Sequence, residues 1–85
     1  MGYRKRAGGG RRDAVEPAIV ATLRAIGCQV WHLSGTGNPD LLVKRAGRFH
    51  VFEVKSGKAK LTANQDARNW PVLRSVDDAL REIAR

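Results

Sequence analysis

The chain has 85 residues, 42% of them hydrophobic, and 16 Lys and Arg against 8 Asp and Glu give a formal net charge of +8. This length suits one compact domain and excludes two, and no apolar run approaches the roughly 20 residues of a membrane span. The charge favours a polyanionic partner, nucleic acid above an anionic membrane surface, because the basic residues are scattered rather than gathered on one amphipathic helix.

The first twelve residues are rich in Gly and Arg, and we expect residues 1–12 to form a flexible basic arm before a single domain of residues 13–85. The arm is either an ordinary loose terminus or a segment that contacts DNA. Nothing near Met1 resembles a signal peptide, so we expect a soluble, cytoplasmic protein. Cys28 is the only cysteine. It excludes an intrachain disulfide and a zinc-finger site, and we expect a small buried apolar residue.

A helix is predicted within residues 13–26. Asp13 is a plausible N-cap, but proline is accommodated only in the first turn, so Pro17 moves the expected start of the regular helix nearer to Glu16. Gly27 supplies the stop. One face carries apolar residues at helical spacing, namely Val15, Ile19, Leu23 and Ile26.

The remaining elements alternate between strand and helix patterns. We expect a strand at 28–33, a turn-rich segment at 34–39, and an antiparallel hairpin of residues 40–44 and 48–55. A basic loop leads to a short helix that opens at 62–65. A short strand at 72–73 and a final helix from Ser75 through Ile83 complete an α/β fold, a small mixed sheet with flanking helices in the order α-β-β-β-α-β-α.

Glu53-Val54-Lys55, on the second hairpin strand, places an acid and a base on one face. Side chains two residues apart on a strand point the same way, so Glu53 and Lys55 project together while Phe52 and Val54 enter the core. A carboxylate that holds a divalent cation, beside an ammonium that orients water, suits phosphodiester hydrolysis. A surface ion pair is the alternative interpretation of this triplet.

Asp40 supports the first interpretation if the hairpin turn spans Arg45 to Arg48. Lys44 then pairs with Phe49, and counting back places Asp40 directly across from Glu53, with Cβ atoms about 5 Å apart. Two carboxylates at that spacing repel each other unless a cation lies between them. A three-residue loop would move Asp40 out of this alignment, and an ordinary turn residue is its alternative role.

Other polar residues allow two interpretations. Glu16, beside the apolar stripe of the first helix, is either an acid favoured by the helix macrodipole or a third acidic group facing the metal. Thr62-x-x-Gln65 matches a capping box, which needs no catalytic role for Gln65. His32 and His50 fit no metal-ligand spacing, and partial burial or exposure explains them.

Four motifs follow one another along the chain, namely Glu16, then residues 37–43 ending in Asp40-Leu41-Leu42-Val43, then Phe52 to Lys55, then Leu61-Thr62 with Gln65. In this order they resemble the virus-type replication-repair nuclease (VRR-NUC) domain, a family of the PD-(D/E)XK nuclease superfamily. Residues 72–79 are also similar to the last strand and helix of that family. The resemblance runs from about residue 13 to the last residue.

The resemblance implies a restriction-endonuclease-like core that hydrolyses DNA with Mg²⁺ or Mn²⁺. It implies metal ligation by Asp40, Glu53, the Val54 carbonyl and Glu16. Lys55 would be the catalytic lysine, acting with Asp40 and Glu53, and Gln65 a supporting residue of the same site.

We therefore expect a metal-dependent DNA endonuclease. By analogy with stand-alone domains of this kind, it would act as a homodimer on branched DNA such as four-way (Holliday) junctions, in DNA repair within a bacterial or phage-infected cell. A non-catalytic basic DNA-binding protein and a flap or nicking nuclease that needs a partner are the alternatives. The residues expected to grip flanking phosphates are Arg4, Lys5, Arg6, Arg11, Arg12, Lys58 and Lys60.

Overall fold

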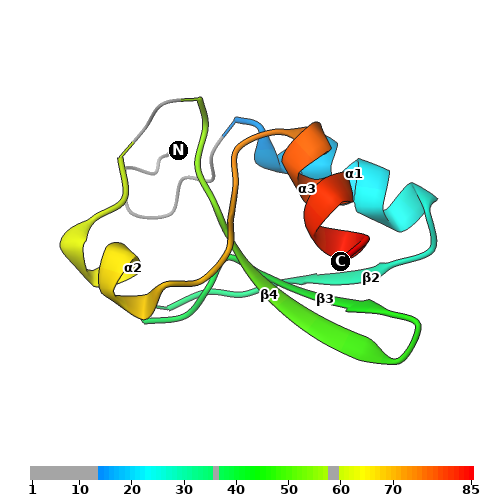
Figure 1. Ribbon diagram of the computed structural model, residues 1–85, viewed down its shortest axis with the longest axis horizontal. Helices are drawn as coiled ribbons and strands as arrows, with labels where there is room; N and C mark the ends of the chain where they lie inside the picture. Colours follow the sequence, from blue (N-terminus) through cyan, green and yellow to red (C-terminus); the bar gives the residue numbers. More distant parts are fainter. Residues whose placement is uncertain (1–13, 36, 58–59) are drawn as a thin grey trace, which may run out of the picture.

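The computed structural model describes residues 14–35, 37–57 and 60–85 of the chain. The predicted arm, the Asp13 cap and Lys58 lie outside these residues. The described part contains helices α1 (Glu16–Ala25), α2 (Ala63–Arg68) and α3 (Val76–Ile83), and strands β2 (Gln29–His32), β3 (Leu41–Arg45), β4 (Arg48–Val54) and β5 (Val72–Leu73). Figure 1 shows α1 and α3 together on one side of the strands and α2 at the other end of the molecule.

The four strands form one mixed sheet in the order β2-β3-β4-β5. Strand β3 is antiparallel to both β2 and β4, and β5 runs parallel to β4. A parallel pair needs a crossover connection, and the chain between β4 and β5 contains α2. The predicted class, a small mixed sheet with flanking helices, is therefore confirmed.

The β3–β4 hairpin turns on two residues, Ala46 and Gly47, which both have positive φ angles, 52° and 79°. This is the backbone that the tight two-residue hairpin turns require, and Gly47 adopts it without a steric cost. The turn fixes the strand register, with Lys44 opposite Phe49. The predicted register is confirmed.

Helix α1 begins where the proline allows it to begin. Its N-cap is Val15, without a side-chain cap, and Pro17 lies in the first turn. Gly27 follows the helix with φ 96°, a conformation that suits glycine, so the predicted stop is confirmed. Helix α3 has the predicted N-cap, Ser75, whose hydroxyl accepts a hydrogen bond from the Asp78 N–H at 3.1 Å.

The core lies between the sheet and the helix pair α1 and α3. Strand alternation sends Phe52 and Val54 into it, as predicted, and Cys28 is buried there too. Burial raises the pKa of the Cys28 thiol. The buried apolar residues are Ile19, Val20, Leu23, Cys28, Val30, Leu41, Val43, Phe52, Val54, Leu73, Ala79 and Ile83. Within the described ranges, no helix is both long and apolar enough to cross a bilayer.

The opposite face of the sheet carries a second apolar row. Trp31, Leu42 and Val51 pair across β2, β3 and β4, and they alternate with the core residues along each strand. Trp31 is 42% exposed, and Phe49 on the same face is 61% exposed. This apolar row therefore lies on the side of the sheet away from α1 and α3.

Candidate active site

Asp40 directly precedes β3, at the open end of the hairpin, and both its backbone and its side chain hold it beside β4. Its N–H donates to the Phe52 carbonyl at 3.0 Å, the last backbone hydrogen bond between the two strands on this side. The next donor along β4 is the Val54 N–H, which donates to Asp40 Oδ2 at 2.8 Å. The carboxylate thus replaces a backbone acceptor, which fixes it beside β4.

Glu53 lies beside Asp40, because the preceding Phe52 pairs with Leu41 and its carbonyl accepts the Asp40 N–H. Both acids line the same cavity. The Glu53 side chain is only 2% exposed. Gln65 Nε2 donates to Glu53 Oε2 at 2.7 Å. Within the described residues, Glu53 Oε1 is buried and accepts no hydrogen bond. A buried carboxylate oxygen of this kind is costly unless a proton or a cation satisfies it.

Charge and burial together raise the pKa of Glu53. Burial is the largest cause, because it disfavours the ionised form, and the negative charge of Asp40 raises the pKa further. The positive charges of Lys55 and Arg68 act in the opposite direction but do not cancel the shift. The folded chain therefore binds a proton at Glu53 more readily than an exposed glutamate would.

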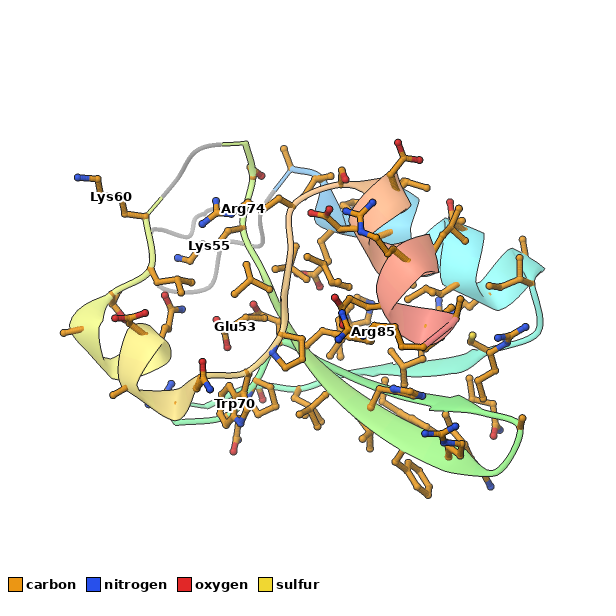
Figure 2. The ribbon with its side chains drawn as sticks, in the orientation of Figure 1. Glu53, Lys55, Lys60, Trp70, Arg74 and Arg85 are labelled. Carbon is orange, nitrogen blue, oxygen red and sulfur yellow. The ribbon has the colours of Figure 1, made fainter. Side chains whose placement is uncertain are left out.

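Lys55 follows directly on β4 and is anchored through its backbone. Its N–H donates to the Leu73 carbonyl at 3.1 Å, which continues the pairing with β5. Its side chain is half-buried, and Figure 2 shows it extending from the end of β4 toward the α2 side, as Glu53 does. The predicted acid-and-base arrangement on one side of β4 is present.

The carboxylates open onto a cavity of about 240 Å³ between the 34–39 loop and α2. On the loop side, the Asn38 N–H donates to the Gly35 carbonyl at 3.2 Å. Gly37 borders Arg68, since a Cβ on this glycine would lie 3.8 Å from the guanidinium. The lining residues are Gly35, Gly37, Asn38, Asp40, Glu53, Thr62, Gln65 and Arg68. Two acids therefore face a small polar hollow that is open to solvent on one side.

Gln65 forms the predicted capping box and also contacts Glu53. The capping box is present, with the Thr62 N–H donating to Gln65 Oε1 at 3.0 Å and the Gln65 N–H donating to Thr62 Oγ1 at 3.2 Å. The amide nitrogen of the same side chain reaches Glu53. The start of α2 thus orients the carboxylate on β4.

Arg68 is a site residue that the sequence reasoning missed. Its guanidinium carbon lies 5.2 Å from the centroid of the Trp70 ring, a cation–π contact that restricts the side chain. The sequence contains a signal for this placement, because Arg68 lies three residues after Gln65 and therefore on the same side of a helix. It adds a positive charge beside the two acids.

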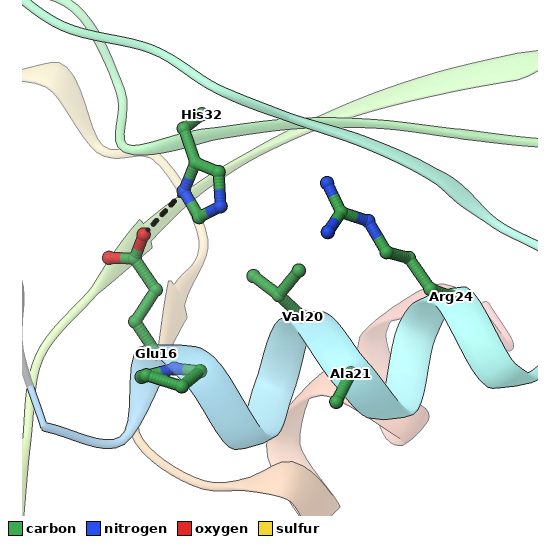
Figure 3. Close-up of a pocket in the computed structure, with 6 residues that line it drawn as sticks. Glu16, Val20, Ala21, Arg24 and His32 are labelled. Carbon is green, nitrogen blue, oxygen red and sulfur yellow. Dashed lines mark hydrogen bonds and ion pairs between the residues drawn. The ribbon is translucent and has the colours of Figure 1, made fainter.

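Glu16 occupies a different hollow, of about 320 Å³, beneath α1. Its Oε2 lies 2.9 Å from His32 Nδ1 (Figure 3). Across the described ranges, no group of three or more His, Cys, Asp and Glu side chains is placed to hold a metal. The structure brings Asp40 and Glu53 together but does not gather Glu16 with them, and metal ligation by Glu16 stays a prediction.

The sequence spacing of His32 matches no ligand pattern and does not indicate its contact with Glu16. The alternation along the strand does indicate that His32 faces the helix, because His32 shares a face with Cys28 and Val30, the face covered by α1.

Of the basic residues predicted to contact DNA, Lys60 is described and exposed. The others, Arg4, Lys5, Arg6, Arg11, Arg12 and Lys58, lie outside the described residues.

The donor set at Asp40 and Glu53 fits a hard divalent cation. Carboxylate oxygens are the ligands that Mg²⁺ prefers, and this ion commonly binds one or two protein carboxylates and keeps several waters. The unsatisfied Glu53 Oε1 is a ready ligand. Two acids are thus enough for Mg²⁺ or Mn²⁺, whereas a zinc site built entirely from protein side chains would need more.

Comparison with known proteins adds no further information about this site. No family model matches the chain, and no curated protein and no solved structure matches it either. Any function assigned to the chain must therefore rest on the geometry of Asp40, Glu53, Lys55 and Gln65.

Proposed function

We propose that the chain is a Mg²⁺- or Mn²⁺-dependent DNA endonuclease with a restriction-endonuclease-like core of the VRR-NUC kind. The single observation that carries the proposal is the facing pair Asp40 and Glu53, held between two strands with Lys55 alongside. The negative charge of Asp40 contributes, after burial, to the raised pKa of Glu53, and a cation held by both acids would relieve that repulsion. The net charge of +8 supports a nucleic-acid substrate.

The polar residues around the cavity would each contribute to the proposed reaction. A bound Mg²⁺ would act as a Lewis acid that offsets charge on the phosphate oxygens. Asp40 and Glu53 would hold the ion, with the Val54 carbonyl as a further ligand. Lys55 would orient the attacking water, and its positive charge would stabilise the hydroxide formed as that water gives its proton to bulk water. Gln65 keeps Glu53 in the ligating rotamer, and Arg68 donates to non-bridging phosphate oxygens.

The decisive experiment incubates labelled duplex, flap and four-way-junction DNA with the protein in Mg²⁺, Mn²⁺ or EDTA. We expect cleavage in the presence of either metal, none in EDTA, and a preference for branched DNA. Lys55→Ala should abolish cleavage while DNA affinity measured in EDTA stays within a factor of about two. Binding without cleavage by the unmodified chain in every metal would favour a DNA-binding role instead.

We extend the proposal to a homodimer, because two sites related by a two-fold axis suit a symmetric junction. The row of Trp31, Leu42 and Val51, with exposed Phe49, supports a second copy as the occupant of that face. Two copies related by a two-fold axis present the same apolar row to each other, and an 85-residue chain gains stability from the added burial. Sedimentation should give a dimer for the full chain and a monomer for Trp31→Glu. A monomer for the unmodified chain would remove this part of the proposal.

A further inference from the structure

A basic hollow lies at the turn end of the hairpin, away from the carboxylate pair. It has a volume of about 170 Å³ and lies between the ends of β3 and β4 and the C-terminal end of α3. Its polar lining consists of Arg45, Arg48, Arg85 and His50. Arg85, labelled in Figure 2, follows the end of α3. Among the described residues that line it, none is acidic.

The arginines of the hollow are placed at a cost to the fold. Arg45 and Arg48 pair directly across the hairpin, and like charges directly opposite each other destabilise a sheet. Both are exposed, and no hydrogen bond or ion pair to another described residue accounts for either side chain. Arg85 contacts Glu82 at 3.4 Å. Local interactions therefore leave a surplus of positive charge.

The end of α3 does not neutralise this surplus. The C-terminal end of a helix carries the equivalent of only about half a negative charge. Against it stand the guanidinium groups of Arg45 and Arg48, in addition to that of Arg85, which contacts Glu82. A guanidinium is always charged and offers a planar fork of donors that matches two phosphate oxygens at once. The surplus is thus chemically suited to a phosphate group.

We propose that this hollow binds a backbone phosphate of the nucleic acid, distinct from the scissile one. Arg48 and Glu53 lie at opposite ends of β4, about 17 Å apart at about 3.4 Å per residue. Arg48 also shares its strand face with His50 and Phe52, whereas Glu53 points to the other face. The inference rests on the proposed nucleic-acid substrate, but it does not depend on cleavage.

The test measures DNA affinity in EDTA by fluorescence anisotropy, with labelled duplex and four-way-junction DNA over a series of salt concentrations. Removing one interaction with a phosphate lowers the slope of log K against log salt by about 0.9. Arg48→Ala should show this decrease, and the double variant R45A/R48A about twice as much, with affinity near 0.1 M salt reduced at least about tenfold.

Arg81→Ala is the matched control, because it removes the same charge from an exposed side chain of α3 that is paired with Asp78. It should leave the slope unchanged. Equal slopes for Arg48→Ala and the unmodified chain would overturn the inference, as would equal decreases in Arg48→Ala and Arg81→Ala. Thermal unfolding of the variants checks that the weaker binding is not a folding defect, and relief of repulsion should keep R45A/R48A at least as stable as the unmodified chain.

Two further measurements, DNA cleavage with Mg²⁺ and binding to phosphatidylserine vesicles, separate this inference from the proposed nuclease function and from lipid binding. If the unmodified chain cleaves DNA with Mg²⁺ but Arg48→Ala keeps its salt slope, the inference fails and the proposed function stands. If the unmodified chain does not cleave DNA but the salt slope decreases in Arg48→Ala, phosphate binding by the hollow is supported and the proposed nuclease function is contradicted. If R45A/R48A keeps its DNA affinity but no longer binds phosphatidylserine vesicles, the hollow serves a lipid surface and the inference is overturned.

Discussion

Gln65 and Glu53 are joined by a 2.7 Å hydrogen bond that links the first turn of α2 to the C-terminal end of β4. The same glutamine closes the capping box with Thr62. A local signal for the start of a helix therefore also positions a buried carboxylate twelve residues earlier in the chain. Loss of this side chain should affect both stability and chemistry.

Gln65→Ala should lower metal-dependent cleavage about 10–100-fold, the usual effect of removing a residue that orients a metal ligand. Thr62→Ala is the control, because it removes the hydroxyl half of the capping box without touching Glu53. It should cost about 1 kcal/mol of stability and leave cleavage nearly unchanged. Single-turnover rates and urea unfolding report the two effects. Equal rate decreases in both variants would show that Gln65 acts only as a cap.

Mg²⁺ or Mn²⁺ should stabilise the folded chain, because the ion binds the Asp40–Glu53 pair in the folded state only. At a free metal concentration 100 times the Kd, the gain is about 2.7 kcal/mol, which shifts the Tm of a domain this small by more than about 10 °C. Thermal unfolding with and without metal measures it. Asp40→Asn and Glu53→Gln should each lose most of the shift, whereas Asp77→Asn, an exposed acid of α3, should keep it.

The raised pKa of Glu53 predicts how the metal-free chain responds to pH. The folded state binds this proton more readily than the unfolded state does, so the associated stability is present at low pH and is lost as pH rises through the folded pKa. Glu53→Gln removes the repulsion and should be the more stable protein in EDTA at pH 8, by a few degrees in Tm. The difference should shrink toward pH 4. A constant difference across that range would contradict the assigned cause.

Glu16 and His32 should act in stability and not in metal binding. His32→Ala removes a 2.9 Å contact from a buried carboxylate and should cost about 1–3 kcal/mol. Glu16→Gln should keep the Mg²⁺-dependent rise in Tm, because the structure does not gather Glu16 with Asp40 and Glu53. A loss of that rise in Glu16→Gln would instead restore Glu16 as a metal ligand, as the resemblance to the VRR-NUC domain implies.

The parts of the site that the sequence predicted correctly are those set by local rules. Ala46-Gly47 allows a two-residue turn, and counting along the strands from that turn places Asp40 against Glu53. Thr62 and Ser75 mark helix starts through their own side chains, so both boundaries could be read from neighbouring residues. Register and capping depend on a few adjacent positions, and no knowledge of the packed fold is needed to infer them.

What the sequence did not predict depends on contacts between distant segments. Strand alternation leaves Glu53 on the side away from the core, yet α2 lies against it and buries it. The contact between Glu16 and His32 joins a helix to the edge of the sheet. The hollow beside Arg48 needs the end of α3 to close it. Each follows from how layers pack together, which no short pattern in the chain specifies.

The two-residue turn at Ala46 and Gly47 has a consequence for how this gene can change. One extra codon at the turn would slide β3 against β4, and the aspartate would no longer face the glutamate at the far end. Insertions at a hairpin tip are ordinarily among the mildest of changes. Here the tip sets the alignment of the two acids, so length there would be as tightly constrained as the identity of the acids themselves.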